Sequence, residues 1–600
     1  MGKRCSMMKT RELARSTLLV AASSLACGHD PQREELDWLR ANAIPLETCE
    51  AGHGFTDLEP LAALVGDARI VSLGECTHGT REVFQMKHRL VEYLASRRGF
   101  TMFSIEANMP EAYRLNEYVL EGKGDPKQLI AGMYFWTWNT EEVLAMVEWM
   151  REFNRSGKGR IEFTGFDMQT PDVAMDVVLD FLETADPQRV PGVKKTYGDL
   201  RNGRFRKGGG RQGGSFGVAT GSLPVEAARG KHVRYGGWIK TEGVRPGYAG
   251  LWMRVDGPSG MLAIDNMQGR GIRGDTDWTQ YALELDVPEE AVNIAFGALH
   301  PGRGKAWFDD LKVEIDGKPF DAADRFDLDF EGPNLKGFHP GGEAYTVAVD
   351  DRVAKVGRQS LRIELTGVPA GKEPADTRPD PAAAAKACGE IVAQLEASRD
   401  RYVGASSEKA TDWAIQNARV VHQCLRLEAN EVSRDESMAT NVKWILDHAP
   451  KETKIVLWAH NGHVGRRKGL QGAMGGFLDE WYGKDQVVCG FAAGDGRYTA
   501  IVQDAGLHND NRLQPPIKGS FEEYFRASGR PRFILDLRHA RQDDPASAWL
   551  TRPHAFRSIG AIAMDGQFMS ADIRSLYDAI IYLDTTSASR SLPQRAPQRF

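Results

Sequence analysis

A carboxylate and an imidazole lie three residues apart in residues 70–80, which read IVSLGECTHGT. Glu75 and His78 follow an apolar run that is typical of a buried strand. A helical pattern of apolar residues begins at Val83. In open α/β sheets, ligands bind where strands end and helices begin. A histidine placed there can act as a general base near neutral pH, and a nearby carboxylate can orient its ring. The alternative is a polar turn in which both side chains satisfy only the backbone.

Three further apolar segments that read as strands also end in ionisable residues. These segments cover residues 100–106, 160–167 and 454–460. The ionisable side chains at their ends are those of Glu106, Asp167, His460 and His463. If the strands are parallel, their carboxyl ends meet at one edge of the sheet. Convergence of four such ends indicates a catalytic site more strongly than any single polar end does.

These side chains have the chemistry that ester cleavage needs. The reaction requires a deprotonated water, a stabiliser for the oxyanion and a proton for the leaving alkoxide. His78, held by Glu75, can supply the first, and a protonated His460 or His463 can supply the second or third. Glu106, if buried, would have a raised pKa and could move a proton.

A metal site is an open alternative, because the same six side chains could bind zinc or another divalent ion. The sequence contains no HExxH motif. Residues 213–217 fit G-x-S-x-G, and residues 208–213 and 269–274 fit G-x-G-x-x-G, but these glycine-rich stretches lack the strand and helix that each motif requires. We therefore expect no cofactor, with a divalent metal as the alternative.

Length and composition limit the architecture. The chain has 600 residues, too many for one core, which indicates two or three domains. Its hydrophobic fraction of 42% and charged fraction of 26% are those of an ordinary globular protein. A net charge of −6 gives no electrostatic reason to expect nucleic acid as a partner. No apolar run approaches the ~20 residues needed to span a bilayer.

The N-terminus predicts export. A basic region precedes the apolar residues 16–26, and Cys27 follows a small residue, as in a bacterial lipoprotein cleavage site. We expect residues 1–27 to be a signal peptide or lipoprotein leader, and the mature protein to be periplasmic or held at a membrane only through a lipid on Cys27. An ordinary N-terminal helix is the alternative. The seven cysteines contain no CxxC pair, so neither a disulfide framework nor a zinc ribbon is indicated.

Strands alternate with helical patterns on both sides of a glycine-rich middle. The alternation predicts an α/β domain with a mostly parallel sheet flanked by helices, in two halves at residues 35–190 and 386–590. In residues 195–366 the short strands have the spacing of an all-β jelly roll or sandwich. Residues 367–385 are rich in proline and alanine and are expected to form a linker. We expect the tail after Ser587 to be frayed.

The motifs that carry these residues are GECTHGTREVFQMKHRL, FSIEANMPEAYRLNEYV, WTWN, GFDMQ, RDESMATN and WAHNGHVGR. Together they resemble the erythromycin esterase-like proteins, a family that includes members labelled as succinoglycan-biosynthesis proteins. The resemblance implies an α/β hydrolytic fold without a serine nucleophile, and its best-known members open a macrolide lactone ring. It makes His78 the general base, with Glu75 and Glu106 as supporting acids and His460 and His463 in a second essential region.

The same motifs supply residues that could contact a substrate. We expect this set to comprise Lys87, Arg114, Asn116, Trp138, Asp167 and Arg434. Some macrolide-hydrolysing members carry arginine where this chain has Lys87, and lysine loses the bidentate geometry of arginine. For Arg434 and the adjacent Asp435, the alternative is a solvated helix start.

Residues 195–366 resemble the jelly-roll carbohydrate-binding modules through WTQYALELDVP and AWFDDLKVE. Residues 326–363 resemble the opening strands of such modules but follow the closing ones, so the module is either permuted or extended. The tryptophans that could stack on a sugar are Trp238, Trp252, Trp278 and Trp307. The alternative is that they are core aromatics.

The sequence therefore predicts an exported hydrolase that acts on a small-molecule ester or lactone and contacts glycan through its inserted domain. The alternative function is a cell-envelope protein that binds polysaccharide without catalysis.

Overall fold

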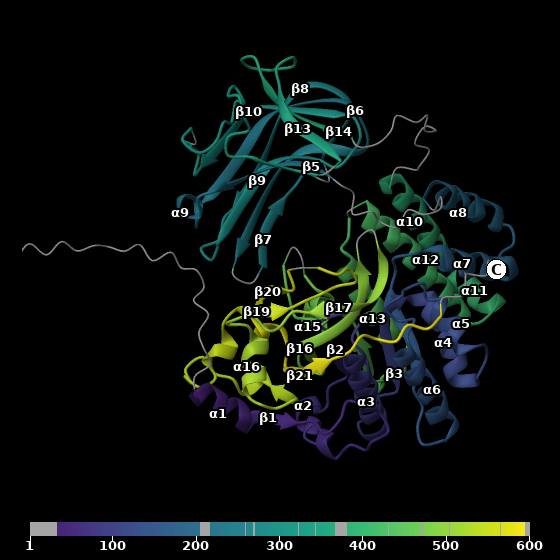
Figure 1. The fold of residues 1–600 in the computed structure, drawn as a ribbon. Helices are drawn as coiled ribbons and strands as arrows, with labels where there is room; N and C mark the ends of the chain where they lie inside the picture. The colour runs from purple at the N-terminus through teal and green to yellow at the C-terminus, as the bar shows by residue number, and fades with distance from the viewer. Residues whose placement is uncertain are drawn as a thin grey trace, which may run out of the picture.

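The computed structural model describes the chain between residues 33 and 593, except for short gaps. The described residues are 33–204, 216–257, 260–267, 270–321, 323–342, 344–366, 381–429, 431–469, 472–502, 505–564 and 566–593. They form an α/β part and a β-rich part. Figure 1 draws the β-rich part at the top and the α/β part below it. The predicted α/β fold class with an additional β-rich region is confirmed.

A nine-stranded sheet forms the centre of the α/β part, with the order β1-β18-β21-β16-β2-β15-β3-β4 and with β17 paired to β16. Its strands are β1 (Ala43–Pro45), β2 (Ile70–Leu73), β3 (Met102–Asn108), β4 (Glu162–Asp167), β15 (Ile455–Trp458), β16 (Gln486–Val502), β17 (Gly506–Leu513), β18 (Arg532–Asp536) and β21 (Ala579–Thr586). The run from β21 through β16, β2, β15 and β3 to β4 is parallel. Because β15 lies between β2 and β3, strands from both halves of the sequence build one sheet.

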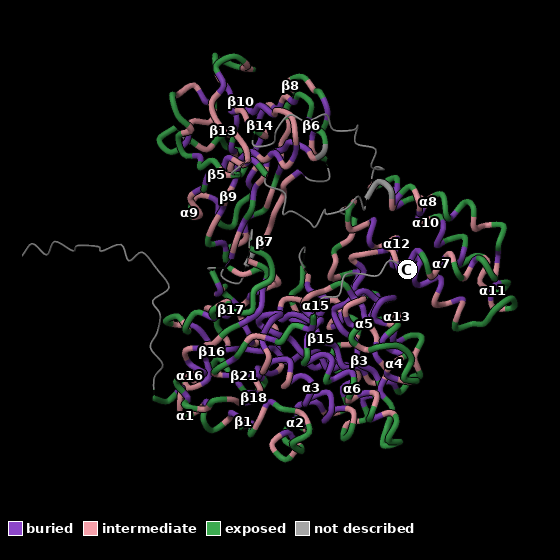
Figure 2. Tube along the Cα trace, turned by 45° about the vertical axis from the view of Figure 1, so that its right-hand side comes forward, coloured by how far each residue is buried: buried purple, intermediate pink, exposed green. Residues whose placement is uncertain are grey.

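Both faces of this sheet are covered, which explains why β2, β3 and β15 are buried at every position. In β2, Ile70 packs into one core while Val71 and Leu73 pack into the other. The face with Val71 carries α2 (Leu61–Val65), α3 (Arg81–Arg97), α4 (Met109–Glu121), α5 (Pro126–Ala131) and α6 (Glu141–Arg155). The face with Ile70 carries α1 (Arg33–Asn42), α7 (Asp172–Ala185), α8 (Val190–Arg204), α10 (Pro381–Ala397), α12 (Glu408–Glu428), α13 (Arg434–Asp447), α15 (Met474–Tyr482) and α16 (Phe521–Ala527). Figure 2 shows the buried residues concentrated along these central strands.

The β-rich part is a two-layered sandwich built around one long strand, β6 (His232–Gly257). The first half of β6 pairs with β8 (Ile272–Asp286) and β10 (Lys305–Ile315), and its second half pairs with β7 (Gly260–Asp265) and β9 (Asn293–His300). The remaining strands are β5 (Gly217–Leu223), β11 (Lys318–Pro319), β12 (His339–Gly341), β13 (Tyr345–Asp350) and β14 (Ser360–Leu365). Because β14 pairs with β10 and β12 pairs with β5, the segment that resembles opening strands belongs to the same sandwich.

The boundaries of the β-rich part differ from the expectation. Its expected start at residue 195 lies inside α8, whose buried Val193, Tyr197 and Leu200 pack with the α/β core. The first strand of the sandwich begins only at Gly217. At the other end, α10 begins at Pro381, inside the expected linker, and residues 367–380 lie outside the described residues.

The described part of the C-terminal tail is not frayed, contrary to the expectation. The Ser589 N–H donates to the carbonyl oxygen of Gly79, and the Leu592 N–H donates to that of Asn139. Leu592 is buried. The tail therefore joins the loop that contains His78 to the loop that contains the WTWN motif.

The predicted leader, including Cys27, lies outside the described residues. None of the described helices has the length and apolar character needed to cross a bilayer. The described cysteines form no disulfide bond with one another, and all of them are buried: Cys49, Cys76, Cys388, Cys424 and Cys489.

Candidate active site

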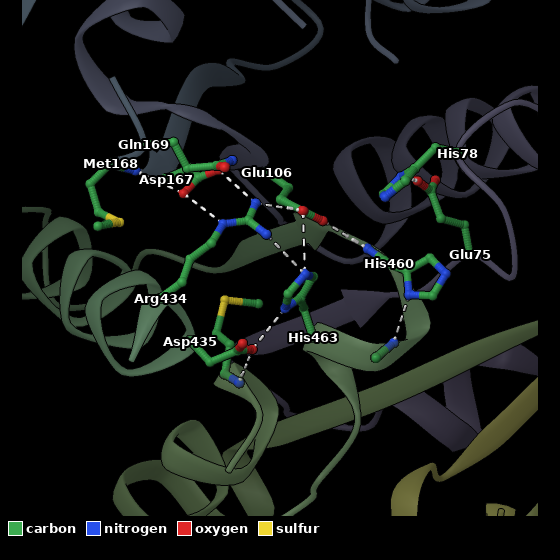
Figure 3. A network of polar contacts seen from close by, with 12 residues as sticks. Glu75, His78, Glu106, Asp167, Met168, Gln169, Arg434, Asp435, His460 and His463 are labelled. Carbon is green, nitrogen blue, oxygen red and sulfur yellow. Dashed lines mark hydrogen bonds and ion pairs between the residues drawn. The ribbon is translucent and has the colours of Figure 1, made fainter. Parts of the chain in front are cut away.

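The ends of four neighbouring parallel strands bring the predicted residues to one edge of the sheet. In the order β2, β15, β3 and β4, these ends carry Glu75, His460, Glu106 and Asp167. Figure 3 shows their side chains together with His463. The convergence expected from the sequence is therefore present.

Glu75 and His78 form a buried pair that fixes the histidine ring. His78 Nδ1 lies 2.6 Å from Glu75 Oε1, while Lys87 Nζ and Trp458 Nε1 donate to Glu75 Oε2 over 2.6 and 2.7 Å. Burial alone would raise the pKa of Glu75, but Lys87 and His78 outweigh it and hold that pKa below its ordinary value. An ionised Glu75 accepts the Nδ1–H of His78, which leaves the lone pair on Nε2. Among the described residues, no hydrogen bond reaches Nε2.

Lys87 supports this pair from inside the protein. Its side chain is 0% exposed, and its Nζ lies 4.4 Å from the centre of the Trp458 ring. Burial lowers the pKa of Lys87 to about 8, although Glu75 opposes the shift. A fully buried ammonium cannot contact a substrate directly, so the structure gives Lys87 a positioning role instead of the expected substrate contact.

A second histidine–carboxylate pair lies at the same edge. His463 Nδ1 lies 2.8 Å from Asp435 Oδ1, which also accepts the backbone N–H of Met474. His463 Nε2 lies 3.1 Å from Arg434 Nη1 and 3.5 Å from Glu106 Oε1. Burial would lower the pKa of His463, but Glu106 and Asp435 raise it above its ordinary value. Nε2 has a partner in either state, because it can accept from Arg434 when neutral and donate to Glu106 when protonated.

Arg434 connects two of the strand ends. Its Nη2 donates to Glu106 Oε1 and to Asp167 Oδ2, each over 2.7 Å. Glu106 also accepts the backbone N–H of His460. Burial would raise the pKa of Glu106, but His463 and Arg434 hold it far below its ordinary value. The expected raised pKa and proton transfer by Glu106 are therefore wrong, because the cations that pair with Glu106 outweigh the effect of its burial.

His460 is held as a neutral imidazole. Its Nδ1 accepts the Gly462 N–H and its Nε2 donates to the carbonyl oxygen of Ile559, each over 3.1 Å. Burial, together with the neighbouring His78 and His463, lowers the pKa of His460 to about 3. The expectation that His460 is protonated near neutral pH is therefore wrong. Of the two later histidines, His463 is the one whose raised pKa favours the protonated ring.

Trp138 packs against the site residues from inside the protein and is not exposed to a substrate, contrary to the expectation. It is buried, its ring edge meets the His78 ring at 6.0 Å between centres, and its Nε1 donates to the carbonyl oxygen of Glu106. The WTWN loop thus holds both strand ends from one side.

Two expected substrate contacts do not reach this network. Asn116 is buried and lies beside the start of β4. Its Oδ1 accepts the backbone N–H of Phe163, and its Nδ2 donates to the side chain of Glu162. Arg114 is exposed on α4, and no hydrogen bond joins it to the network within the described chain. Both side chains lie away from the site because α4 begins at the site and runs away from it.

Trp458 donates to Glu75 but is not among the expected site residues, although it is the first residue of the WAHNGHVGR motif. A second signal for it is the alternation of strand residues. It places Val456 and Trp458 on the face of β15 that packs against α3, and α3 carries Lys87.

The donor set does not fit a metal ion in this arrangement. Among the described residues, no three His, Cys, Asp or Glu side chains are grouped so that they could hold one. Glu75 already accepts from Lys87, Trp458 and His78, and both ring nitrogens of His460 are bonded to the backbone.

Comparison with known proteins places the chain in a family. A family model described as erythromycin esterase matches residues 95–214 and 344–586, together more than half of the chain. The interruption contains most of the sandwich. Glu106, Asp167 and the later histidines lie inside the matched segments, whereas Glu75 and His78 precede them.

Curated relatives match only in part. Erythromycin esterase type II of Escherichia coli is 29% identical over 159 residues, 25% of this chain and 37% of that protein. YbfP of Bacillus subtilis, an uncharacterized regulator of the helix-turn-helix type, is 40% identical over 102 residues, 17% of this chain and 34% of that protein. YbfO of the same organism, named only as an inferred hydrolase, is 28% identical over 164 residues, 27% of this chain and 36% of that protein. The chain thus spans about a third of the length of each of these relatives.

Two solved structures share the fold. A Bacillus cereus protein has a TM-score of 0.58 at 20% identity, covering 94% of this chain and 100% of that chain. A succinoglycan biosynthesis protein has a TM-score of 0.57 at 18% identity, covering 94% of this chain and 99% of that chain. These likenesses show the fold alone, while the family match rests on the sequence. The chain belongs to the erythromycin esterase family.

Proposed function

We propose that this protein is a hydrolase that cleaves a carboxylic ester or lactone with water activated by His78. The observation that carries the proposal is the presence of two histidine–carboxylate pairs at one sheet edge, His78 with Glu75 and His463 with Asp435. One pair presents a ring lone pair, and the other favours the protonated ring. An acid and a base held in different environments are the arrangement that acyl transfer to water needs.

In the proposed reaction, His78 Nε2 takes a proton from a water molecule whose oxygen attacks the carbonyl carbon. Glu75 stabilises the imidazolium that forms. Arg434 and His463, whose side chains are each 22% exposed, are the donors placed to stabilise the tetrahedral oxyanion. When the intermediate collapses, the carbon–oxygen bond to the leaving group breaks and His463 gives that oxygen its proton. His78 releases the proton taken from water, and His463 regains one from solvent.

The relatives support the reaction class through their names, since one is an erythromycin esterase and another an inferred hydrolase. The site itself supports hydrolysis without a nucleophilic serine, because the groups that converge are histidines, carboxylates and an arginine. No step of the proposal passes through a metal.

The test is hydrolysis of a panel of esters and lactones, macrolides included, by the leaderless protein with and without EDTA. We expect turnover that resists EDTA and a loss of kcat/KM of about 10²–10⁴-fold in His78→Ala, the range that general base catalysis contributes. His448→Ala is the matched control, since His448 is exposed and bonds only to Trp444 among the described residues. Turnover abolished by EDTA would contradict the proposal. Absence of turnover across the panel would favour the polysaccharide-binding alternative.

A further inference from the structure

The segment after β21, residues 587–592, lies along the edge of the sheet that carries the candidate active site. We call this segment the C-terminal strap. It follows β21 directly, and β21 runs parallel to β16, which runs parallel to β2. The strap therefore leaves the sheet at the edge where Glu75 and His78 lie, and Figure 1 draws it as the yellow chain that continues from β21. The family match ends at residue 586, so the strap lies outside it.

The first half of the strap is bonded to the loop that contains His78. The carbonyl oxygen of Gly79, the residue after His78, accepts the backbone N–H groups of Ser589 and Thr499, each over 2.9 Å. Thr499 belongs to β16, and its hydroxyl donates to the carbonyl oxygen of Ser589 over 3.1 Å. A side chain at Gly79 would place its Cβ 1.9 Å from the carbonyl oxygen of Thr499, so the close approach of these backbones requires glycine.

Two glutamates join the strap to the helices that follow the two loops of the site. Glu82, in the first turn of α3, accepts the N–H of Ser587 over 2.6 Å and its hydroxyl over 2.5 Å. Glu142, in the first turn of α6, accepts the N–H of Arg590 over 3.2 Å. Because α3 follows the loop of the proposed base and α6 follows the WTWN loop, the strap connects the starts of both helices.

The end of the strap is bonded to the WTWN loop. The carbonyl oxygen of Asn139 accepts the N–H of Leu592 over 2.9 Å, and Asn139 Nδ2 donates to the carbonyl oxygen of Leu592 over 3.3 Å. Trp138, the neighbour of Asn139, packs its ring edge against His78. Ser589 and Leu592 are buried, so their side chains offer no surface to a substrate. The strap thus holds two neighbours of the His78 ring from inside the protein.

We infer that the strap is a positioning segment for the catalytic base: it fixes the main chain on both sides of the His78 ring, so that Nε2 meets the attacking water. This inference rests on the proposed role of His78. Glu75 orients the ring through Nδ1, but the ring keeps its place only while the main chain that carries it is fixed. A displacement of about 1 Å in a reacting group can cost a factor of about 10² in rate. Because the strap offers no surface to a substrate, loosening it should lower kcat and leave KM nearly unchanged.

The test removes one hydrogen bond of the strap in the full-length protein. In Ser589→Pro, the nitrogen can no longer donate to Gly79. The matched control, Ser589→Ala, keeps this N–H and loses a hydroxyl that has no hydrogen-bond partner among the described residues. We expect Ser589→Pro to lower kcat by about 10–100-fold with little change in KM, and Ser589→Ala to keep the kcat of the wild type.

A second pair of variants guards against misfolding caused by the proline. Glu82→Ala removes the acceptor of Ser587 from the surface of α3, whereas Glu82→Gln keeps an oxygen that can accept the Ser587 N–H. We expect kcat to fall severalfold in Glu82→Ala and to be retained in Glu82→Gln.

Amide hydrogen exchange measures the same contact without turnover. The Arg81 N–H donates to the carbonyl oxygen of Ser587 over 2.8 Å, so a peptide that covers residues 79–82 reports whether the strap is in place. This peptide should exchange faster in Ser589→Pro than in Ser589→Ala. Equal exchange in the two variants, or a kcat of Ser589→Pro no lower than that of Ser589→Ala, would overturn the inference. If the wild type hydrolyses no ester or lactone, the proposed function fails, and the exchange rates alone decide whether the strap holds the His78 loop.

Discussion

The ion pair between Lys87 and Glu75 offers a quantitative test of how the site is held. The 2.6 Å separation of Nζ and Oε2 corresponds to an attraction of about 6 kcal/mol at an effective dielectric constant of about 20. Desolvation of both groups cancels much of this attraction, but removal of one partner leaves the other charge buried. We therefore expect Lys87→Met to lower the free energy of unfolding by about 3–5 kcal/mol.

A double-mutant cycle separates the role of the pair in stability from its role in catalysis. Glu75→Gln should cost less stability than Lys87→Met, because Lys87, with a pKa of about 8, can release its proton near neutral pH. The double variant removes both charges, so its loss of stability should fall short of the sum of the single losses by about 2 kcal/mol or more. Its activity should stay at least ~10²-fold reduced, because His78 has lost the carboxylate that orients it.

The assays are urea unfolding for stability and steady-state hydrolysis of the best ester in the panel for kcat and KM. Lys87→Met should lower kcat with little change in KM, since Lys87 is not exposed. A variant that raises KM while leaving kcat and stability unchanged would refute the reasoning and restore the substrate contact expected from the sequence.

Three further predictions follow from the structure and the sequence. Trp458→Phe removes the indole donor to Glu75 while keeping an aromatic ring, so kcat should fall about tenfold at constant KM; a change in KM alone would argue against this role. Despite burial, the ion pairs of Glu106 hold its folded pKa below its ordinary 4.5, so they contribute stability that is fully present above that pH and is lost as the pH falls. Glu106→Gln should therefore make the free energy of unfolding in urea depend less on pH below about pH 5. An unaltered pH dependence would count against the ion pairs of Glu106. Finally, palmitate labelling of the full-length protein in a bacterial host should succeed and should be lost in Cys27→Ala; equal labelling of both would dismiss the lipoprotein prediction.

The sheet and its edge could be predicted from the sequence because the signals are local. Buried parallel strands are short apolar runs, and the polar residue that ends each run marks the edge. Glu75, Glu106, Asp167 and His460 each lie at the end of such a strand or within two residues of it. Because these strands are parallel, their carboxyl ends bring the four residues to one edge of the sheet.

The protonation states could not be predicted, because they depend on partners far away in the sequence. Arg434 reaches Glu106 across 328 residues, and His463 and Arg434 together reverse the rise in the pKa of Glu106 that burial alone would cause. The pKa of His460 is lowered because its ring is buried and because His78 and His463 lie beside it. None of these contacts leaves a periodic pattern in the sequence.

The motifs also do not show which of their side chains are exposed to solvent and which are buried. Lys87 and Trp138 belong to the motifs of the site, yet both are buried and act on other side chains. In the sandwich, all four tryptophans have similar strand contexts, and only the pairing of β6 with β9 shows that Trp252 lies next to Gly297. The C-terminal tail is short and polar, so its attachment to Gly79 and Asn139 depends on loops that only the fold brings together.

The most direct test of the central claim is chemical rescue of the proposed base. His78→Gly should reduce kcat/KM by about 10²–10⁴-fold, and added imidazole should restore part of the activity. The matched variant His460→Gly should show no rescue, because the ring that it loses is bonded to the backbone through both nitrogens. If His78→Gly keeps activity within a few-fold of the wild type, His78 is not the base and the proposed mechanism is contradicted.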